Sequence, residues 1–401
     1  MIDIKDRNTS FKICIVKLSA MGDIIHAMVA LQFIKKQFPN SKIDWIVENG
    51  FKGVLENNPH IDNILPINLK SIKTNKSEIF NQIKLLNKYA KNNYDLVIDA
   101  QGLIKSAIVS KILGGRVVGS QILGFDKDSI REGISSWFYD KTVSIPYENN
   151  VIDRNIKVLC KSLDISVSEK DLMKKDSFLY SKENDTYKTN NIIFVVGASK
   201  ANKVYPKEKY LDIAHLLKED VLVVWGNEEE YSIAQWLSSQ SNFIKTAPRG
   251  NLDDLKRTIS ESRLVIGADT GPTHMAWALN IPSITIFGNT PEYRNTYITN
   301  INKVIKSDSK VNPLKLDKND LLYSTEFSAS TEQQTNKSLT SGLLNNKDSK
   351  ILRNNFLLAQ LLDMKQNNVK GFFWNWFTTR HNPMLFILPT QNMKLRGIIM
   401  Q

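Results

Sequence analysis

Asp23 carries the first candidate chemistry in this chain, because its carboxylate follows a tight turn at Gly22 just after an apolar run. The run 13–16 is typical of a buried parallel strand, whereas the apolar residues after Asp23 recur at helical spacing. Open α/β sheets bind ligands at the carboxyl ends of their strands, and a carboxylate held there is a candidate general base. Asp is equally common as a helix N-cap, so this turn alone leaves both roles open.

Asp99 begins a second polar segment, residues 99–106, at the end of another predicted strand. The segment contains a glycine turn at Gly102 and a cation, Lys105, at the start of a predicted helix. Both residues also have simple structural interpretations, in which Asp99 caps the helix and Lys105 is solvated. Their position beside a strand end favours a site only modestly.

Two segments of the second half could bind a nucleotide. Small residues and cations fill residues 196–206, where Ser199, Lys200 and Lys203 could hold phosphate oxygens. In the next segment, Glu228 follows a predicted strand and could bind the hydroxyls of a ribose. An acidic residue also suits a helix start because of the helix dipole, and Glu228 taken alone fits that role better.

The segment 267–276 runs from a strand through a turn into a helix, whose N-terminus is suited to a diphosphate. Gly271 allows close backbone approach, and Thr270 and Thr273 add hydroxyl donors. His274 could contact a ligand or serve equally well as a satisfied capping side chain. This segment is the most specific of the later motifs.

The elements that must position these segments alternate between strands and helices, which predicts parallel sheets with right-handed crossovers. The predicted strands are 12–16, 43–47, 95–99, 192–196, 221–225, 264–267 and 283–287. The predicted helices are 24–38, 78–92, 104–113, 208–218, 228–238 and 251–261. A polar linker at 181–190 divides them, so we expect two Rossmann-like domains, residues 1–180 and 191–325, that face each other across a substrate cleft.

Residues 326–401 differ in character and form an atypical C-terminal tail of unknown role. Residues 351–365 have one amphipathic face and could be a helix that returns to the first domain. The aromatic cluster 372–377 could touch a membrane interface, although such clusters more often pack or remain disordered.

The composition of the chain indicates which classes of partner it can bind. The 401 residues carry a formal net charge of +12, with a pI of about 9.3, which favours phosphorylated substrates or anionic lipid. No nucleic-acid motif, signal peptide or apolar run of about 20 residues is recognisable, so we expect a cytoplasmic protein that does not bind nucleic acid. Cys14 and Cys160 form neither a metal pair nor a disulfide framework.

Taken together, the segments resemble the heptosyltransferases of glycosyltransferase family 9 over residues 11–300. Three motifs carry this resemblance: Lys-x-Ser-x-Met-Gly-Asp at 17–23, Asp-Ala-Gln-Gly-Leu-x-Lys-Ser at 99–106 and Asp-Thr-Gly-x-Thr-His at 269–274. The first two are most similar to the type I branch, which adds the first heptose to Kdo-lipid A. The resemblance implies the GT-B fold and an inverting transfer from ADP-L-glycero-β-D-manno-heptose, without cofactor or required metal.

The resemblance also implies residue roles. Asp23 would be the base that deprotonates the acceptor hydroxyl, and Lys203 would stabilise the departing ADP. Glu228 would hold the ribose, while the diphosphate would be lined by Ser199, Asp269, Thr270, Gly271, Thr273 and His274. The acceptor would be bound by Ser19, Gly22, Lys70, Lys73, Lys76, Lys105 and Arg131.

Three positions depart from the family pattern. Ala20 and Ala198 stand where relatives often have hydroxyl residues, and Asn150 stands where some relatives place a histidine near the acceptor. The expected partners are ADP-heptose, Kdo-lipid A and the cytoplasmic surface of the inner membrane, and we expect a monomer. The alternatives are a later heptosyltransferase, a nucleotide-sugar epimerase of the same fold, and a catalytically inactive binding protein.

Overall fold

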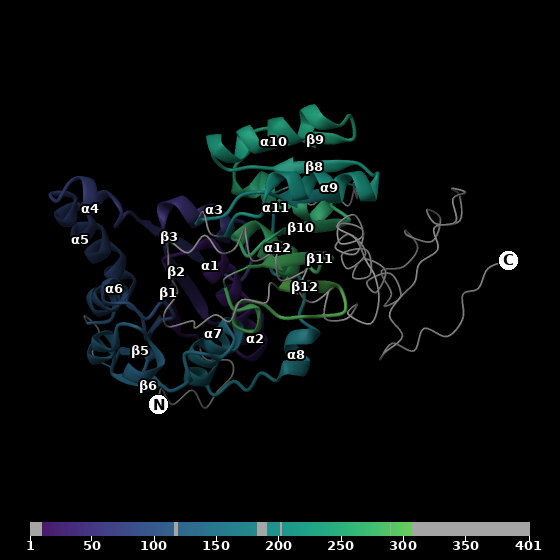
Figure 1. The fold of residues 1–401 in the computed structure, drawn as a ribbon. Helices are drawn as coiled ribbons and strands as arrows, with labels where there is room; N and C mark the ends of the chain where they lie inside the picture. The colour runs from purple at the N-terminus through teal and green to yellow at the C-terminus, as the bar shows by residue number, and fades with distance from the viewer. Residues whose placement is uncertain (1–9, 116–118, 183–190, 201–202, 289, 307–401) are drawn as a thin grey trace.

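The computed structural model describes residues 10–115, 119–182, 191–200, 203–288 and 290–306. It contains two parallel sheets of six strands, one from each half of the described chain (Figure 1). The predicted tail 326–401, with its helix 351–365 and aromatic cluster 372–377, lies outside the described residues, so these expectations remain predictions. The domain limits 180, 191 and 325 also remain predictions.

The first sheet has the strand order β3-β2-β1-β4-β5-β6, and every neighbouring pair is parallel. In that order the strands are β3 Asn63–Ile67, β2 Lys42–Glu48, β1 Lys12–Val16, β4 Leu96–Asp99, β5 Gln121–Phe125 and β6 Lys141–Val143. The central strands β1 and β4 are buried along almost their whole length because apolar clusters cover both faces of the sheet.

The second sheet repeats this plan with the order β12-β11-β10-β7-β8-β9, again entirely parallel. Its strands are β12 Asn302–Lys306, β11 Ser283–Phe287, β10 Leu264–Ala268, β7 Ile192–Val195, β8 Val221–Val224 and β9 Ile244–Thr246. The predicted pair of Rossmann-like halves is therefore confirmed.

Helices connect the strands. Those of the first half are α1 Met21–Met28, α2 Ala30–Gln37, α3 Lys52–Leu55, α4 Ser71–Thr74, α5 Glu78–Tyr89, α6 Ile104–Gly114, α7 Val151–Cys160 and α8 Glu169–Met173. Those of the second half are α9 Lys207–Leu217, α10 Glu228–Gln240, α11 Leu252–Glu261, α12 Gly271–Ala278 and α13 Glu292–Asn295. The 3₁₀ turns are η1 Asn49–Phe51, η2 Ala90–Asn92, η3 Lys127–Ser129, η4 Gly133–Phe138 and η5 Lys161–Leu163.

The predicted helix 24–38 is wrong in its start and its continuity. The structure breaks it at Val29 into α1 and α2, and α1 begins three residues early, at Met21. Asp23 is therefore the third residue of the helix rather than the N-cap, and the N-cap is Ala20. This shift matters because it changes which backbone group the carboxylate can cap.

Candidate active site

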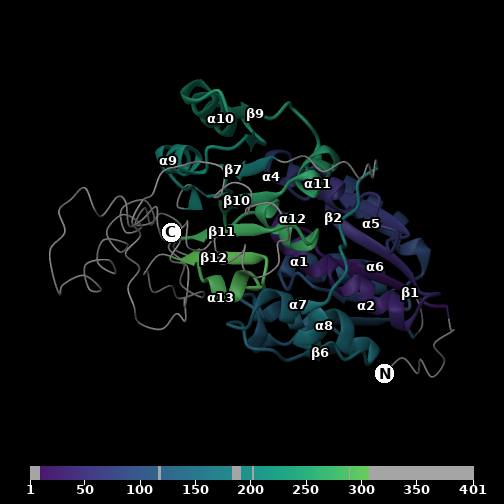
Figure 2. The same cartoon turned by 90° about the vertical axis from the view of Figure 1, so that its right-hand side faces the viewer.

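The carboxyl ends of the two sheets meet through helices α1 and α12, which pack against each other in the middle of the molecule (Figure 2). Two glycines allow this contact. A Cβ on Gly22 would lie 3.0 Å from Cδ2 of His274, and a Cβ on Gly271 would lie 2.5 Å from Sδ of Met21. A side chain at Gly271 would collide with Met21, and one at Gly22 would crowd the ring of His274, so glycine at both positions lets the first turns of α1 and α12 lie side by side.

Asp23 lies in the first turn of α1, next to this contact, and is only partly buried. One carboxylate oxygen accepts the backbone N–H of Ala20 at 3.1 Å. Ala20 has no hydroxyl with which to cap the helix, and Asp23 supplies the reciprocal half of a capping arrangement from the third position. The carboxylate thus has a capping role and still reaches solvent, so the two expected roles are compatible.

Asp99 is fully buried and holds the second segment in place. One carboxylate oxygen accepts the backbone N–H groups of Gln101 and Gly102 at 2.8 and 3.1 Å, and the other accepts the hydroxyl of Tyr139 at 2.8 Å. Burial raises the pKa of Asp99, while these hydrogen bonds oppose the rise. Asp99 is therefore structural, although it supports the turn before α6 rather than capping the helix itself.

The first two segments are tied together at the sheet edge. The side-chain oxygen of Gln101 accepts the N–H groups of Leu18 and Ser19 at 3.0 and 3.1 Å. Lys17 lies buried below them, and its Nζ donates to the backbone oxygen of Ala100 at 2.7 Å. Burial lowers the pKa of Lys17, while the nearby carboxylates of Asp23 and Asp99 oppose that change. Lys17 is thus a cation beneath the candidate base.

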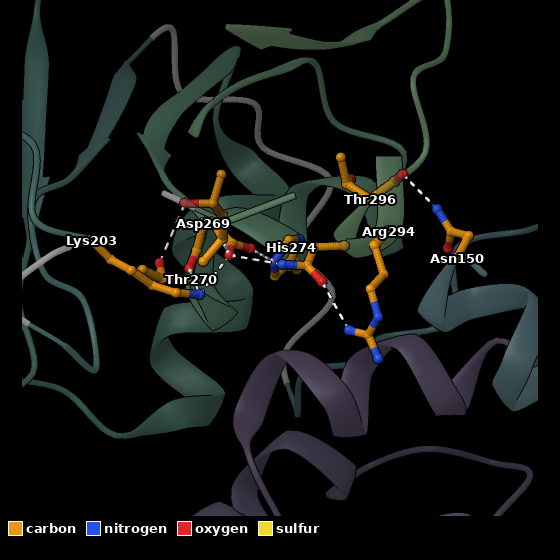
Figure 3. Close-up of polar contacts among 10 residues, drawn as sticks. Asn150, Lys203, Asp269, Thr270, His274, Arg294 and Thr296 are labelled. Carbon is orange, nitrogen blue, oxygen red and sulfur yellow. Dashed lines mark hydrogen bonds and ion pairs between the residues drawn. The ribbon is translucent and has the colours of Figure 1, made fainter. Parts of the chain in front are cut away.

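Asp269 is the centre of the donor-side cluster (Figure 3). Its Oδ2 pairs with Nζ of Lys203 at 2.5 Å and accepts from the side chains of Thr290 and Asn295, while Oδ1 contacts Nε2 of His274 at 3.0 Å. Burial alone would raise the pKa of Asp269, but Lys203 and His274 together lower it well below the ordinary value. Asp269 is a permanent anion that fixes the position of Lys203.

His274 connects this cluster to α1. Its ring lies edge-on to the ring of His26, with 4.4 Å between the centroids, and it also contacts Gly22. His274 is thus satisfied by the carboxylate of Asp269 and not by capping a backbone group. His26 is buried with neither ring nitrogen hydrogen-bonded within the described part of the chain, and burial lowers its pKa well below the ordinary value. The two imidazole rings therefore fill the space between the helices.

The other predicted diphosphate ligands surround the start of α12. Thr270 is its N-cap and makes no side-chain capping bond, so the backbone N–H groups of Gly271 and Thr273 keep their capacity to bind an anion, whereas Pro272 has none. The hydroxyls of Thr270 and Thr273 are 3.4 Å apart, but Thr273 is almost fully buried. Ser199 is exposed on the loop after β7.

A pocket of about 450 Å³ lies beyond the ends of β8 and β9. It is lined by Trp225, Glu228, Tyr231, Gln235, Thr246, Ala247, Pro248 and Arg249. The rings of Trp225 and Tyr231 lie 4.5 Å apart, and the indole is fixed by its N–H bond to the backbone oxygen of Ala247 at 2.8 Å. Aromatic walls with a carboxylate at the rim suit a nucleoside, so Glu228 lies where a ribose-binding residue is needed. Arg249, at the same rim, was not predicted.

The predicted acceptor cations lie on segments that follow strands β3, β4 and β5 of the first sheet. Lys70, Lys73, Lys76, Lys105 and Arg131 are all exposed. Lys70 and Lys105 are both close enough to Glu48 to lower its pKa, against burial, which raises it. Ser19 and Gly22, by contrast, belong to the α1 turn itself. The structure therefore gathers Ser19, Gly22 and Asp23 on one turn, while Lys73 lies on α4, Lys105 on α6, and Lys70 and Lys76 beside α4.

Sequence reasoning predicted Arg131 as an acceptor residue but missed the cationic cluster to which it belongs. Arg131, Arg154 and Arg294 all lie over the ring of Tyr147, and Arg294 also donates from Nε to its backbone oxygen at 2.9 Å. Arg294 comes from the second half of the chain, and the other three residues from the first. A cation after β11 was the available signal for Arg294, but its partner could not be read from the sequence.

The family model of glycosyltransferase family 9 (heptosyltransferase) matches residues 83–322. Lipopolysaccharide heptosyltransferase 1 of Campylobacter coli is 41% identical over 335 residues, which cover 78% of this chain and 95% of the relative. This chain belongs to glycosyltransferase family 9. Lipopolysaccharide heptosyltransferase 1 of Escherichia coli K12 is 28% identical over 70% of this chain and 88% of its own length.

Solved structures agree on the fold. The Escherichia coli heptosyltransferase WaaC with ADP-2-deoxy-2-fluoro heptose superposes with a TM-score of 0.63 at 22% identity, covering 82% of this chain and all of that chain. A family 9 glycosyltransferase from Veillonella parvula gives a TM-score of 0.65 at 16% identity. The predicted GT-B fold, family and heptosyltransferase class are thus confirmed for this family member.

The three departures have structural consequences. Asn150 caps α7 and donates to the backbone oxygens of Tyr293 and Thr296 at 2.9 and 2.8 Å, so it fastens the two halves of this heptosyltransferase together (Figure 3). Ala20 has no side-chain oxygen that could cap α1, and the carboxylate of Asp23 accepts the backbone N–H of Ala20. Ala198 adds no hydroxyl to the loop after β7.

Two further findings concern metals and membranes. Within the described ranges, no group of three or more His, Cys, Asp or Glu residues is arranged to hold a metal ion. Among the helices of those same ranges, none combines the length and the hydropathy that a membrane span needs.

Proposed function

We propose that this heptosyltransferase transfers L-glycero-D-manno-heptose from ADP-L-glycero-β-D-manno-heptose to a hydroxyl of the Kdo residue in Kdo-lipid A, an inner-core step of lipopolysaccharide synthesis. The observation that carries the proposal is the contact between α1 and α12 at Gly22 and Gly271. It sets a partly exposed carboxylate beside a helix N-terminus and a fixed lysine. Inverting sugar transfer needs a base on one side of the anomeric carbon and positive charge on the other.

Asp23 would take the proton from the acceptor hydroxyl as its oxygen attacks the anomeric carbon. The single backbone bond to Ala20 orients the carboxylate while leaving oxygen lone pairs for that proton. The buried side chain of Lys17 lies near enough for the Asp23 carboxylate to oppose the fall in the pKa of Lys17, so the two groups attract each other. Ser19 and Gly22 would shape the acceptor side of the same turn.

Lys203 would neutralise the departing ADP. Its ammonium has three N–H groups, and the structure gives it the backbone oxygen and Oδ2 of Asp269 as acceptors, at 3.2 and 2.5 Å. One N–H remains for a phosphate oxygen. The backbone amides at the start of α12, with Thr270 and Ser199, would complete the diphosphate site. Thr273 and His274 would act from behind it, since both are buried.

The pocket beyond β8 and β9 would hold the adenosine, with the base against Trp225 and the ribose hydroxyls on Glu228. The exposed lysines Lys70, Lys73, Lys76 and Lys105, together with Arg131, would bind the phosphates and carboxylates of the acceptor. The reaction would use no cofactor and no required metal. The enzyme would act as a monomer at the cytoplasmic face of the inner membrane and would not bind nucleic acid.

The test is to incubate the enzyme with ADP-heptose and Kdo-lipid A, then measure ADP release and the mass of the lipid. We expect equal amounts of ADP and an acceptor that is heavier by one heptose. Transfer only to an already heptosylated core would instead indicate a later heptosyltransferase. Isomerised donor without ADP would indicate an epimerase, and binding of ADP-heptose without turnover would indicate an inactive binding protein.

A further inference from the structure

Exposed apolar side chains gather on one face of the first half of the chain. Of the ten large apolar side chains exposed in the described ranges, seven lie on α5, α6 and η4. We call them the α5–α6 patch: Ile79, Phe80, Ile83, Ile104, Ile108, Ile134 and Trp137. Phe80 is 74% exposed and Trp137 is 80% exposed. Apolar side chains scattered singly over a surface need no explanation, but such a concentration marks an interaction site.

The seven side chains lie on three elements that are neighbours in space. Helix α6 packs against both α5 and η4, and Figure 1 shows α4, α5 and α6 together at the end of the first half that lies away from the second sheet. The side chain of Glu132, just before η4, accepts the N–H of Ile104 at 2.7 Å, which joins the start of α6 to that turn. On α6, Ile104 and Ile108 are one helical turn apart and point outward, while Ala107 and Val109 are buried.

Lysines border this patch. Between residues 70 and 114 the chain has eight lysines and three acidic residues, and one of the three, Asp99, is fully buried. Lys84 and Lys88 are exposed on α5, and Lys105 and Lys111 are exposed on α6. An apolar centre with a lysine border matches a bilayer with anionic headgroups, whereas a second copy of the same face would place lysine against lysine.

We propose that the α5–α6 patch docks the enzyme onto an anionic lipid bilayer. The choice of a bilayer rests in part on the proposed function, since the acceptor there is a membrane lipid. Lys105 adjoins Ile104 and approaches Glu48 together with Lys70, so the patch borders the predicted acceptor side. Docking there would present the first sheet's carboxyl edge to headgroups. This surface is distinct from the aromatic cluster 372–377 considered above.

The test is sedimentation of the full chain with vesicles of phosphatidylglycerol and phosphatidylethanolamine. The double variant Phe80→Ser/Trp137→Ser should bind these vesicles less tightly by about tenfold or more, because each side chain loses its burial in the bilayer interface. The matched control Met173→Ser/Ile298→Ser changes two exposed apolar residues outside the patch and should bind like the wild type. Wild-type binding should weaken with salt and with vesicles of phosphatidylcholine alone.

Equal vesicle binding by wild type and patch variant, or no wild-type binding, would overturn the proposal. A concentration-dependent dimer, seen by light scattering and lost in the patch variant, would assign the patch to a second copy instead. Transfer to detergent-dispersed Kdo-lipid A separates this proposal from the proposed function, since the patch variant should keep that activity. Loss of vesicle binding in an enzyme that never uses Kdo-lipid A would leave the docking surface standing.

Discussion

Each half of the described chain places an aspartate near the contact between α1 and α12, and the two carboxylates are held in opposite ways. Asp23 is partly exposed and accepts one backbone N–H. Asp269 is 6% exposed and contacts Lys203, His274, Thr290 and Asn295. A carboxylate that exchanges a proton with substrate needs spare lone pairs and access, whereas one that fixes a cation needs neither. Under the proposed function, the first half would therefore supply the group that exchanges a proton, and the second half the fixed charges.

Asp23→Asn should have the largest effect, because it keeps the capping role of Asp23 and removes its proposed role as a base. The amide oxygen can still accept the N–H of Ala20, but the side chain cannot take up a proton, so kcat should fall by about 10³-fold while stability changes little. ADP release and thermal unfolding measure the two effects. The matched control Asp128→Asn alters an exposed aspartate on η3 and should retain activity. Unchanged kcat in Asp23→Asn would reduce this carboxylate to a helix cap.

Asp269→Asn, unlike Asp23→Asn, should destabilise the fold, by about 3 kcal/mol, because it leaves the partly buried ammonium of Lys203 without its anion. Denaturant unfolding at neutral pH measures the loss. The pKa of Asp269 is lowered in the folded state, so its stabilisation is present above the ordinary Asp value of about 3.9 and is lost as the pH falls below it. The difference between wild type and variant should therefore be constant near neutrality and shrink below about pH 4. A difference that persists in acid would assign the stabilisation to packing.

Gly22→Ala and Gly271→Ala test whether helices α1 and α12 must be in close contact. Each methyl group would enter occupied space, against the His274 ring or the Met21 side chain, and overpacking typically costs about 1–3 kcal/mol. Both variants should also lower kcat, because they move Asp23 away from the diphosphate site. Gly50→Ala is a suitable control, since nothing lies within 4 Å of a Cβ there. Full activity in both variants would show that the contact is dispensable.

Glu228→Gln should have the smallest effect, limited to donor binding. Loss of a charged partner for the ribose hydroxyls should raise KM for ADP-heptose about tenfold, with kcat and stability nearly unchanged. Glu229→Gln, at the next position but outside the pocket lining, is the matched control. Equal KM values for the two variants would remove Glu228 from the donor site.

Whether a strand could be predicted from the sequence depended largely on how deeply it is buried. The sequence predicted the central strands, such as β1 and β10, whose continuous apolar runs reflect cover on both faces. It missed all four edge strands, of which β3 contains Pro66 and β12 has the sequence Asn-Lys-Val-Ile-Lys. It also missed the interior strand β5, whose five residues include Gly124. Edge strands are short and partly polar because they face solvent, so their pattern resembles that of loops.

The candidate site divides in a similar way. Motifs that lie within one strand–turn–helix unit, such as 99–106 and 269–274, were found where the structure has them. Contacts between units were not, because they depend on how the two halves pack: His26 against His274, and Arg294 over Tyr147. The contact of Lys17 with Ala100 is one contact between units for which the sequence held a signal. A lysine between Val16 and Leu18 interrupts an apolar run, and all three residues are buried.

The meeting of α1 and α12 at two glycines also has a thermodynamic consequence. The two first turns pack closely, so under the proposed function a displacement of α12 by a bound diphosphate would be transmitted to the turn that carries Asp23. The donor and acceptor sites would then be energetically linked. Any factor by which ADP-heptose changes the affinity for acceptor must equal the factor by which acceptor changes the affinity for ADP-heptose.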